Sequence, residues 1–418
     1  MAVRSIAQES VSSVETDPRR WRILAVLSIA ELLGMSLWFG ASAVAPQLAT
    51  EWQLSSAQSA LLTTLVQFGF VAGTALSAML NLADVVPSRT LFSIAALIGA
   101  AVNAAILAAP SFAVVLLLRF LTGLALAGVY PPAMKMISTW FQARRGLAIG
   151  AIVGALTVGK ATPYLVHAIP GAGTREVILA ATIAAIFGAM LVGLLYSDGP
   201  YSFASRPFSW SLAGTVVREQ RWRLATGSYL GHMWELYAFW TWIPAYVAAS
   251  LAARSGNDVT GGGIVSLLAF LAIAVGGAGC VWGGIYADRS GREKLVAIAL
   301  AASGACCLLS GIVFGAPLLL LAAVTLVWGF FVIADSAQFS ALVTESVPSH
   351  AVGTALTLQV SLGFLLTMLP IQLLPAIAAT AGWRWAFPIL AVGPAAGILI
   401  ITRLARLRRT ATPAIAAT

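Results

Sequence analysis

The chain has 418 residues, of which 60% are hydrophobic and only 9% charged, and its formal net charge is +9. Soluble domains usually carry about 25% charged residues, so a soluble fold of this composition would lack the polar surface it needs. The basic residues lie near the ends of the apolar blocks and do not form one continuous patch. Their excess therefore does not indicate a nucleic-acid partner. The composition excludes an ordinary soluble protein.

The apolar residues come in blocks of roughly 20, which as helices cross about 30 Å of hydrocarbon. These blocks are too long for barrel strands, and helices satisfy every backbone polar group within lipid. The sequence therefore predicts an all-α membrane protein with twelve transmembrane helices. The predicted spans are 21–45, 57–80, 90–109, 112–136, 146–169, 176–196, 224–251, 263–287, 295–315, 318–343, 352–378 and 385–404.

The basic residues between spans predict the orientation of the chain. Nearly all of them fall on the side that also holds the N-terminus, and only Arg175, Arg254 and Arg384 fall in loops on the other side. The positive-inside rule then places both termini in the cytoplasm, and we expect a multi-pass protein of the bacterial inner membrane. No apolar stretch precedes Trp21, so we expect no cleavable signal peptide.

Glu31 in the first span and Arg119 in the fourth are charged residues that lie well inside predicted spans. A charge near the bilayer centre costs at least about 2.5–3.5 kcal/mol on insertion scales, so such residues are candidates for a functional site. We predict that Glu31 takes part in proton coupling. The planar fork of Arg119 suits a carboxylate, so this residue is predicted to bind substrate, as is the aromatic Trp38 of the first span.

Lys160 lies near the middle of the fifth span and shares a helix face with Tyr164. Its stem cannot easily reach either membrane surface, so the ammonium group needs an anion. Glu31, Glu235 and a substrate carboxylate remain open as that partner. We predict that Lys160 and Tyr164 bind substrate.

A polar segment at 198–221 divides six spans from six, and the two halves resemble each other. Residues 20–22 and 221–223 both read Arg-Trp-Arg, and both 109–110 and 316–317 read Ala-Pro. Such repeats are common among secondary transporters, whose substrate site lies between the halves. The predicted organisation is a cytoplasmic tail (1–20), a six-helix bundle (21–197), a cytoplasmic linker (198–221), a second six-helix bundle (222–405) and a cytoplasmic tail (406–418).

The seventh span carries an acid and an imidazole on one face. His232 and Glu235 are three residues apart, and Phe239 and Trp242 continue the same stripe. A carboxyl beside an imidazole in a partly dry cavity is typical of a proton site, and the alternative is a static ion pair that packs the helix. Glu235, Phe239 and Trp242 are also predicted to sandwich an organic ligand.

Asp335 in the tenth span is the remaining intramembrane acid. We assign it to proton coupling together with Glu31, His232 and Glu235. The alternative is that Asp335 simply pairs with Arg119 or Lys160. The other aromatic residues of the seventh span, Trp234, Tyr237, Trp240 and Tyr246, are divided between the transport path, helix packing and the membrane interface.

The loop after the eighth span, residues 284–294, reads GIYADRSGREK. It resembles the loop pattern G-x-x-x-D-R-x-G-R-[RK] of the major facilitator superfamily, displaced by one residue at its end. The corresponding loop after the second span is degraded but keeps an acid and an arginine. The resemblance implies a cytoplasmic latch, in which a carboxylate bonds a neighbouring helix terminus or arginine. The implied gating residues are Asp84, Arg89, Gly284, Asp288, Arg289, Gly291 and Arg292.

Residues 119–123 likewise resemble the intramembrane Arg-x-x-x-Gly element of this superfamily, and residues 231–237 (GHMWELY) resemble bacterial permeases of the cyanate and nitroimidazole type. The resemblance implies two pseudo-symmetric six-helix bundles that move a small solute by alternating access, as a monomer and without a cofactor. Lys160 and Arg119 favour an organic anion as the solute, and the buried acids favour protons as the coupling ion.

Two other transport functions remain as alternatives. The aromatic residues also suit a multidrug exporter, but a lysine at position 160 would repel the lipophilic cations that such exporters often carry. A copper-type importer would use paired Met and His ligands, whereas His232 and Met233 are adjacent and point about 100° apart. The sequence contains no nucleophile, phosphate-loop or metal motif, so we do not expect an enzyme. Cys280, Cys306 and Cys307 lack the spacing of metal ligands, so we expect free thiols.

Overall fold

The computed structural model describes residues 17–142, 144–201, 208–256 and 262–411. Within these residues the chain forms helices and turns but no strand, and eleven helices are long and apolar enough to cross a membrane. The protein is therefore an all-α membrane protein, as predicted. The predicted terminal tails lie largely outside the described residues.

The α-helices follow one another along the chain with short connections. Their bounds are α2 Arg19–Met35, α3 Gly40–Ala43, α4 Ala45–Trp52, α5 Ser56–Met79, α6 Leu82–Val85, α7 Ser88–Ala105, α8 Phe112–Leu126, α9 Tyr130–Ser138, α10 Arg145–His167, α11 Thr174–Leu195, α12 Trp210–Arg218, α13 Gln220–Ser255, α14 Gly263–Ser290, α15 Arg292–Ile312, α16 Leu318–Phe331, α17 Ser336–Thr344, α18 Val352–Ala381, α19 Trp383–Ala386 and α20 Val392–Ala411.

Three predicted spans are interrupted by turns. The first predicted span was expected to run unbroken over 21–45, but α2 ends at Met35 and a turn leads into α3. The fourth span breaks between α8 and α9, where Pro131 and Pro132 open α9 and cannot donate backbone hydrogen bonds. The tenth span breaks between α16 and α17. The predicted linker contains one helix of its own, α12.

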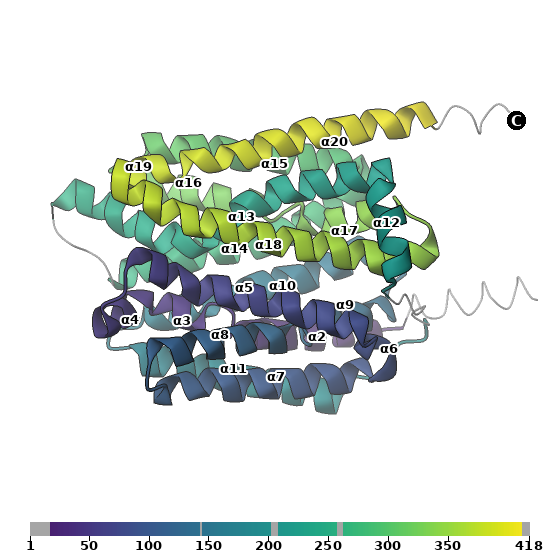
Figure 1. The fold of residues 1–418 in the computed structure, drawn as a ribbon, viewed down its shortest axis with the longest axis horizontal. Helices are drawn as coiled ribbons and strands as arrows, with labels where there is room; N and C mark the ends of the chain where they lie inside the picture. The colour runs from purple at the N-terminus through teal and green to yellow at the C-terminus, as the bar shows by residue number, and fades with distance from the viewer. Residues whose placement is uncertain (1–16, 143, 202–207, 257–261, 412–418) are drawn as a thin grey trace, which may run out of the picture.

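Helices from the first and second parts of the chain lie in two layers (Figure 1). Purple to blue helices up to α11 form the lower layer, and teal to yellow helices from α12 onward form the upper one. The layers meet where α10 packs along α14 and α5 packs along α18. We call the end that holds α12 and the close of α20 the α12 end, and the opposite one the α4 end.

Glycines bring α10 and α14 into backbone contact. A Cβ added to Gly150 would lie 2.8 Å from the Cys280 carbonyl oxygen, and one added to Gly154 would lie 2.8 Å from that of Gly277. Small residues allow such close approach, which is how helices associate in lipid, where there is no hydrophobic drive between them. The contact between the layers is therefore close at these positions.

Candidate functional site

Lys160 lies in the contact between the two layers and is almost fully buried, with 1% of its surface exposed. Its Nζ donates a 2.5 Å hydrogen bond to Tyr237 Oη on α13. The same nitrogen lies 3.8 Å from the ring centroid of Trp38 and 5.4 Å from that of Trp240. Aromatic faces stabilise a desolvated cation by about 2 kcal/mol, which offsets only part of the cost of burying an ammonium group. We call Lys160, Trp38, Tyr237 and Trp240 the lysine cage.

Glu31 on α2 is the nearest charged candidate to the lysine cage. It is fully buried, and neither of its carboxylate oxygens has a hydrogen-bond partner in the described part of the chain. Glu31 and Lys160 interact electrostatically, but the described residues contain no ion pair between them. The ammonium group of Lys160 can therefore donate, and the carboxylate of Glu31 can accept, hydrogen bonds that the described residues do not supply.

Three further polar groups around the cage also lack a partner. They are Trp38 Nε1, Trp240 Nε1 and Tyr164 Oη, all of which are buried. Phe39 links two of them, because its ring centroid lies 6.1 Å from that of Tyr164 and 6.4 Å from that of Trp240. An indole N–H and a phenol O–H are hydrogen-bond donors, so the surroundings of Lys160 are rich in unused donors. Such a set suits a ligand that carries negative charge.

Arg119 is already bonded within the protein. Its Nε donates to the Leu62 carbonyl oxygen of α5 at 3.0 Å and its Nη1 to that of Leu37 at 3.0 Å, while Nη2 donates to that of Trp38. The guanidinium group therefore satisfies one carbonyl of α5 and two at the break after α2, so its fork is not free for a substrate carboxylate in this arrangement. Arg119 acts as a positioning residue that holds Trp38 over Lys160.

We expect Arg119→Lys to destabilise the protein although it keeps the charge. One ammonium group cannot reach all three carbonyls, and each buried carbonyl left without a donor costs about 1–3 kcal/mol. The melting temperature of the purified protein in detergent should fall by several degrees. The matched control is Arg218→Lys on the exposed surface of α12, which should melt like the unmodified chain. Equal melting temperatures for both variants would contradict the positioning role.

Among the described residues, the acid and the imidazole of α13 form no ion pair with each other, so the static pair considered as the alternative is not found; their part in proton coupling stays a prediction. His232 Nδ1 lies 3.0 Å from Asp335 Oδ1, both side chains being 1% exposed. Glu235 accepts hydrogen bonds from Ser303 Oγ at 2.9 Å and Cys307 Sγ at 3.2 Å, and also from the Trp328 indole. Helical spacing set His232 and Glu235 on one side of α13, but different neighbouring helices supply their partners.

Asp335 likewise pairs neither with Arg119 nor with Lys160, the two partners considered from the sequence. It lies in the turn before α17, beside α13. The three buried acids Glu31, Glu235 and Asp335 therefore fall into two groups: Glu31 interacts with Lys160, while the partners of Glu235 and Asp335 come from the second part of the chain.

Phe239 and Trp242 face away from Lys160 as judged by their contacts. The Phe239 ring lies 4.4 Å from that of Trp328, and Trp242 donates a 2.8 Å hydrogen bond to the Ile371 carbonyl oxygen. The aromatic contacts to Lys160 from α13 come from Tyr237 and Trp240, which nothing in the sequence ranked above the other aromatic residues of this span. The binding of a ligand by Phe239 and Trp242 stays a prediction.

The predicted latch residues lie at the α12 end. A Cβ added to Gly146, in the first turn of α10, would lie 2.7 Å from both carboxylate oxygens of Asp288. A Cβ added to Gly284 would likewise lie 2.7 Å from the Gly146 carbonyl oxygen. A carboxylate over the first turn of a helix is stabilised by the free N–H groups there. The carboxylate of Asp288 on α14 thus lies beside the beginning of α10, and its action as a latch stays a prediction.

The other predicted latch residues have separate partners. Arg292 pairs with Glu345, and Arg89 donates to the Gly193 carbonyl oxygen. Gly291 has a φ of +92°, which favours glycine, and Arg289 is exposed in the last turn of α14. The side chain of Asp84 lies outside the described residues.

Polar side chains also join the two layers away from the α12 end, a feature that the sequence did not reveal. His167 of α10 contacts Gln47 Nε2 through Nε2 at 2.5 Å and Ser266 Oγ through Nδ1 at 2.7 Å. Between α5 and α18, Gln372 Nε2 donates to Thr64 Oγ1 at 3.1 Å. The layers are therefore in contact on both sides of the lysine cage, and the cage is enclosed.

The cysteines form no disulfide within the described residues. Cys280, Cys306 and Cys307 are free and buried, as predicted. Within the described part of the chain, no group of three His, Cys, Asp or Glu side chains lies close enough to hold a metal ion.

Comparison with known proteins adds one finding. Residues 27–371, well over half of the chain, match the family model described as Major Facilitator Superfamily. No curated protein matches the chain.

Proposed function

This chain belongs to the major facilitator superfamily of membrane transporters, and we propose that it is a proton-coupled secondary transporter of a small organic anion. The observation that carries this proposal is the lysine cage. A buried ammonium group contacts residues of both layers, lacks a carboxylate partner and lies among unused hydrogen-bond donors. The narrower likeness to cyanate and nitroimidazole permeases stays a prediction.

The charge of Lys160 supports an anion as the solute. A carboxylate or similar group that enters the cage would receive the Lys160 charge together with indole and phenol donors, and charge-assisted bonds of this kind are about twice as strong as neutral ones. The aromatic faces would contact the organic part of the solute. A lipophilic cation would meet the ammonium group directly, which disfavours the multidrug alternative.

Glu31 supports proton coupling. Its carboxylate interacts with Lys160 across the site, so an ionised Glu31 and a bound anion would compete for one positive charge. Binding of the anion is therefore favoured when Glu31 carries a proton. When Glu31 loses that proton, its carboxylate again attracts Lys160 and competes with the anion. One proton and one anion would then move together, in the same direction.

The elements around the cage support alternating access. Lys160 and Trp38 come from the first part of the chain, and Tyr237 and Trp240 from the second, so movement of one layer against the other would open or close the cage. The Asp288 contact over α10 would stabilise closure at the α12 end. The His167 contact with Ser266 would do the same towards the α4 end.

Proteoliposomes with an imposed pH gradient test this function. We expect a set of small carboxylic acids to include one that accumulates inside vesicles when the outside is acidic, with accumulation abolished by a protonophore. The uncharged amide of the same acid is the matched control and should not be transported. Equal flux of acid and amide, or flux independent of the gradient's direction, would contradict the proposal.

A further inference from the structure

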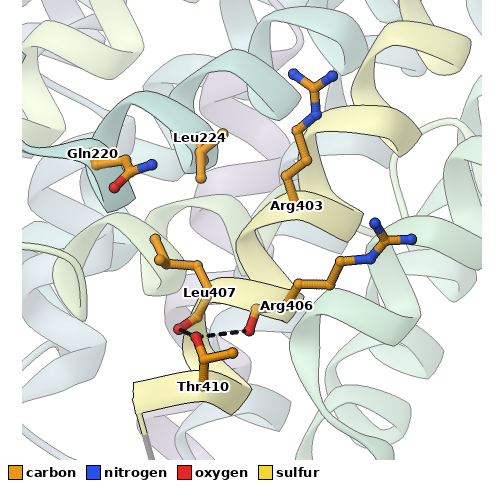
Figure 2. Close-up of a pocket in the computed structure, with 6 residues that line it drawn as sticks. All are labelled: Gln220, Leu224, Arg403, Arg406, Leu407 and Thr410. Carbon is orange, nitrogen blue, oxygen red and sulfur yellow. Dashed lines mark hydrogen bonds between the residues drawn. The ribbon is translucent and has the colours of Figure 1, made fainter.

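An open groove of about 450 Å³ lies at the α12 end, away from the lysine cage. It runs between the beginning of α13 and the last turns of α20 (Figure 2). Its lining combines polar and apolar side chains: Gln220, Leu224, Arg403, Arg406, Leu407 and Thr410.

The two arginines of the groove carry positive charges that no described acid neutralises in an ion pair. Arg403 and Arg406 are both exposed and stand three positions apart on one helix face. Figure 2 shows both side chains extended away from the α20 backbone. Neither has an ion pair among the described residues. Arg408 on the same helix differs, because it pairs with Glu293 at 2.7 Å and also with Glu345.

The groove lies at the ends of two candidate membrane spans. Gln220 and Leu224 belong to the first turns of a span that begins at Gln220, and Thr410 is the last residue of the span formed by α19 and α20. The side chains of Leu224 and Leu407 are only partly buried. The groove therefore offers positive charge beside an apolar surface, at the end of two membrane-spanning helices.

We propose that this groove binds an anionic phospholipid. The headgroup phosphate lies between the guanidinium groups of Arg403 and Arg406, and an acyl chain lies against Leu224 and Leu407. Arginine forks match the geometry of phosphate oxygens, and basic pockets between transmembrane helices are typical sites for anionic headgroups. The apolar side chains beside the charges favour a lipid over free phosphate, which has no apolar part to cover them.

Native mass spectrometry of the full chain, purified in detergent and freed of lipid, tests this site. Phosphatidylglycerol is titrated in, and phosphatidylcholine serves as the zwitterionic comparison. We expect R403Q/R406Q to bind phosphatidylglycerol about 30-fold more weakly, since each arginine near the surface contributes about fivefold. The matched control is R22Q/R218Q, which removes two exposed arginines outside the groove, near the beginning of α2 and the end of α12, and should bind normally.

Four outcomes would overturn the proposal. One is unchanged binding by R403Q/R406Q, and another is an equal loss in R22Q/R218Q, which would mean that the lipid responds to overall charge. The third is equal binding of phosphatidylcholine by the unmodified chain. The fourth is displacement of the lipid by millimolar inorganic phosphate, which would identify the groove as a phosphate site. A circular dichroism spectrum unchanged from that of the parent confirms that each variant is folded.

Discussion

Lys160→Met is expected to abolish binding of the transported anion while the protein stays folded. The substitution keeps the length of the side chain and its contact with the Trp38 ring, but removes the charge that the anion requires. Loss of one partner of a buried, hydrogen-bonded charge pair costs about 2–5 kcal/mol, so affinity should fall about 30-fold to several thousandfold. Isothermal titration of the purified protein with its anion measures this change.

The stability of the Lys160→Met variant separates binding from folding. Lys160 has no carboxylate partner within ion-pair distance in the described residues, so the substitution breaks no ion pair. It also removes the free-energy cost of a buried charge. The melting temperature should stay level or rise. Lys294→Met removes an exposed lysine at the beginning of α15 and should retain full affinity. If Lys160→Met also binds with full affinity, Lys160 does not belong to the site.

Glu31→Gln is expected to uncouple transport from the proton gradient. The amide keeps the shape of the side chain but can neither gain nor lose a proton, so the competition for Lys160 is lost permanently. With a pH difference of one unit, one coupled proton supports up to about tenfold accumulation. We expect this accumulation to fall to a ratio of about one, while exchange of labelled for unlabelled anion continues. Both quantities come from the same proteoliposomes.

Two acids provide the comparison for Glu31→Gln. Glu51→Gln changes an exposed carboxyl on α4 and should accumulate the anion normally. Glu235→Gln changes a carboxyl whose oxygens already accept three hydrogen bonds, so we expect lower stability and retained coupling. Normal accumulation by Glu31→Gln together with loss in Glu235→Gln would move the proton site to α13.

Particular residues show where sequence reasoning succeeded. The long apolar blocks predicted the helices because lipid demands about 20 apolar residues for each crossing, and the loop at 284–294 predicted the family that the comparison then matched. The same rule against buried charge selected Glu31, Lys160, His232, Glu235 and Asp335, all of which are buried.

Partners were predicted less well, because a helix fixes only which residues of its own share a face. His232 and Glu235 share a side of α13, yet Asp335 pairs with one, while Ser303 and Cys307 bond the other. Arg119 needed carbonyls from a break after α2 that the apolar pattern did not reveal.

The membrane-spanning helices and the charges buried among them could be predicted from the residues alone, because both follow from the cost of placing polar groups in lipid. Which of those charges meet depends on the packing of the helices. The packing of α14 against both α10 and α13 brings Lys160 to Tyr237 across 77 positions of the chain. A contact over that separation depends on how the helices are arranged in space, and the local pattern of residues does not specify it.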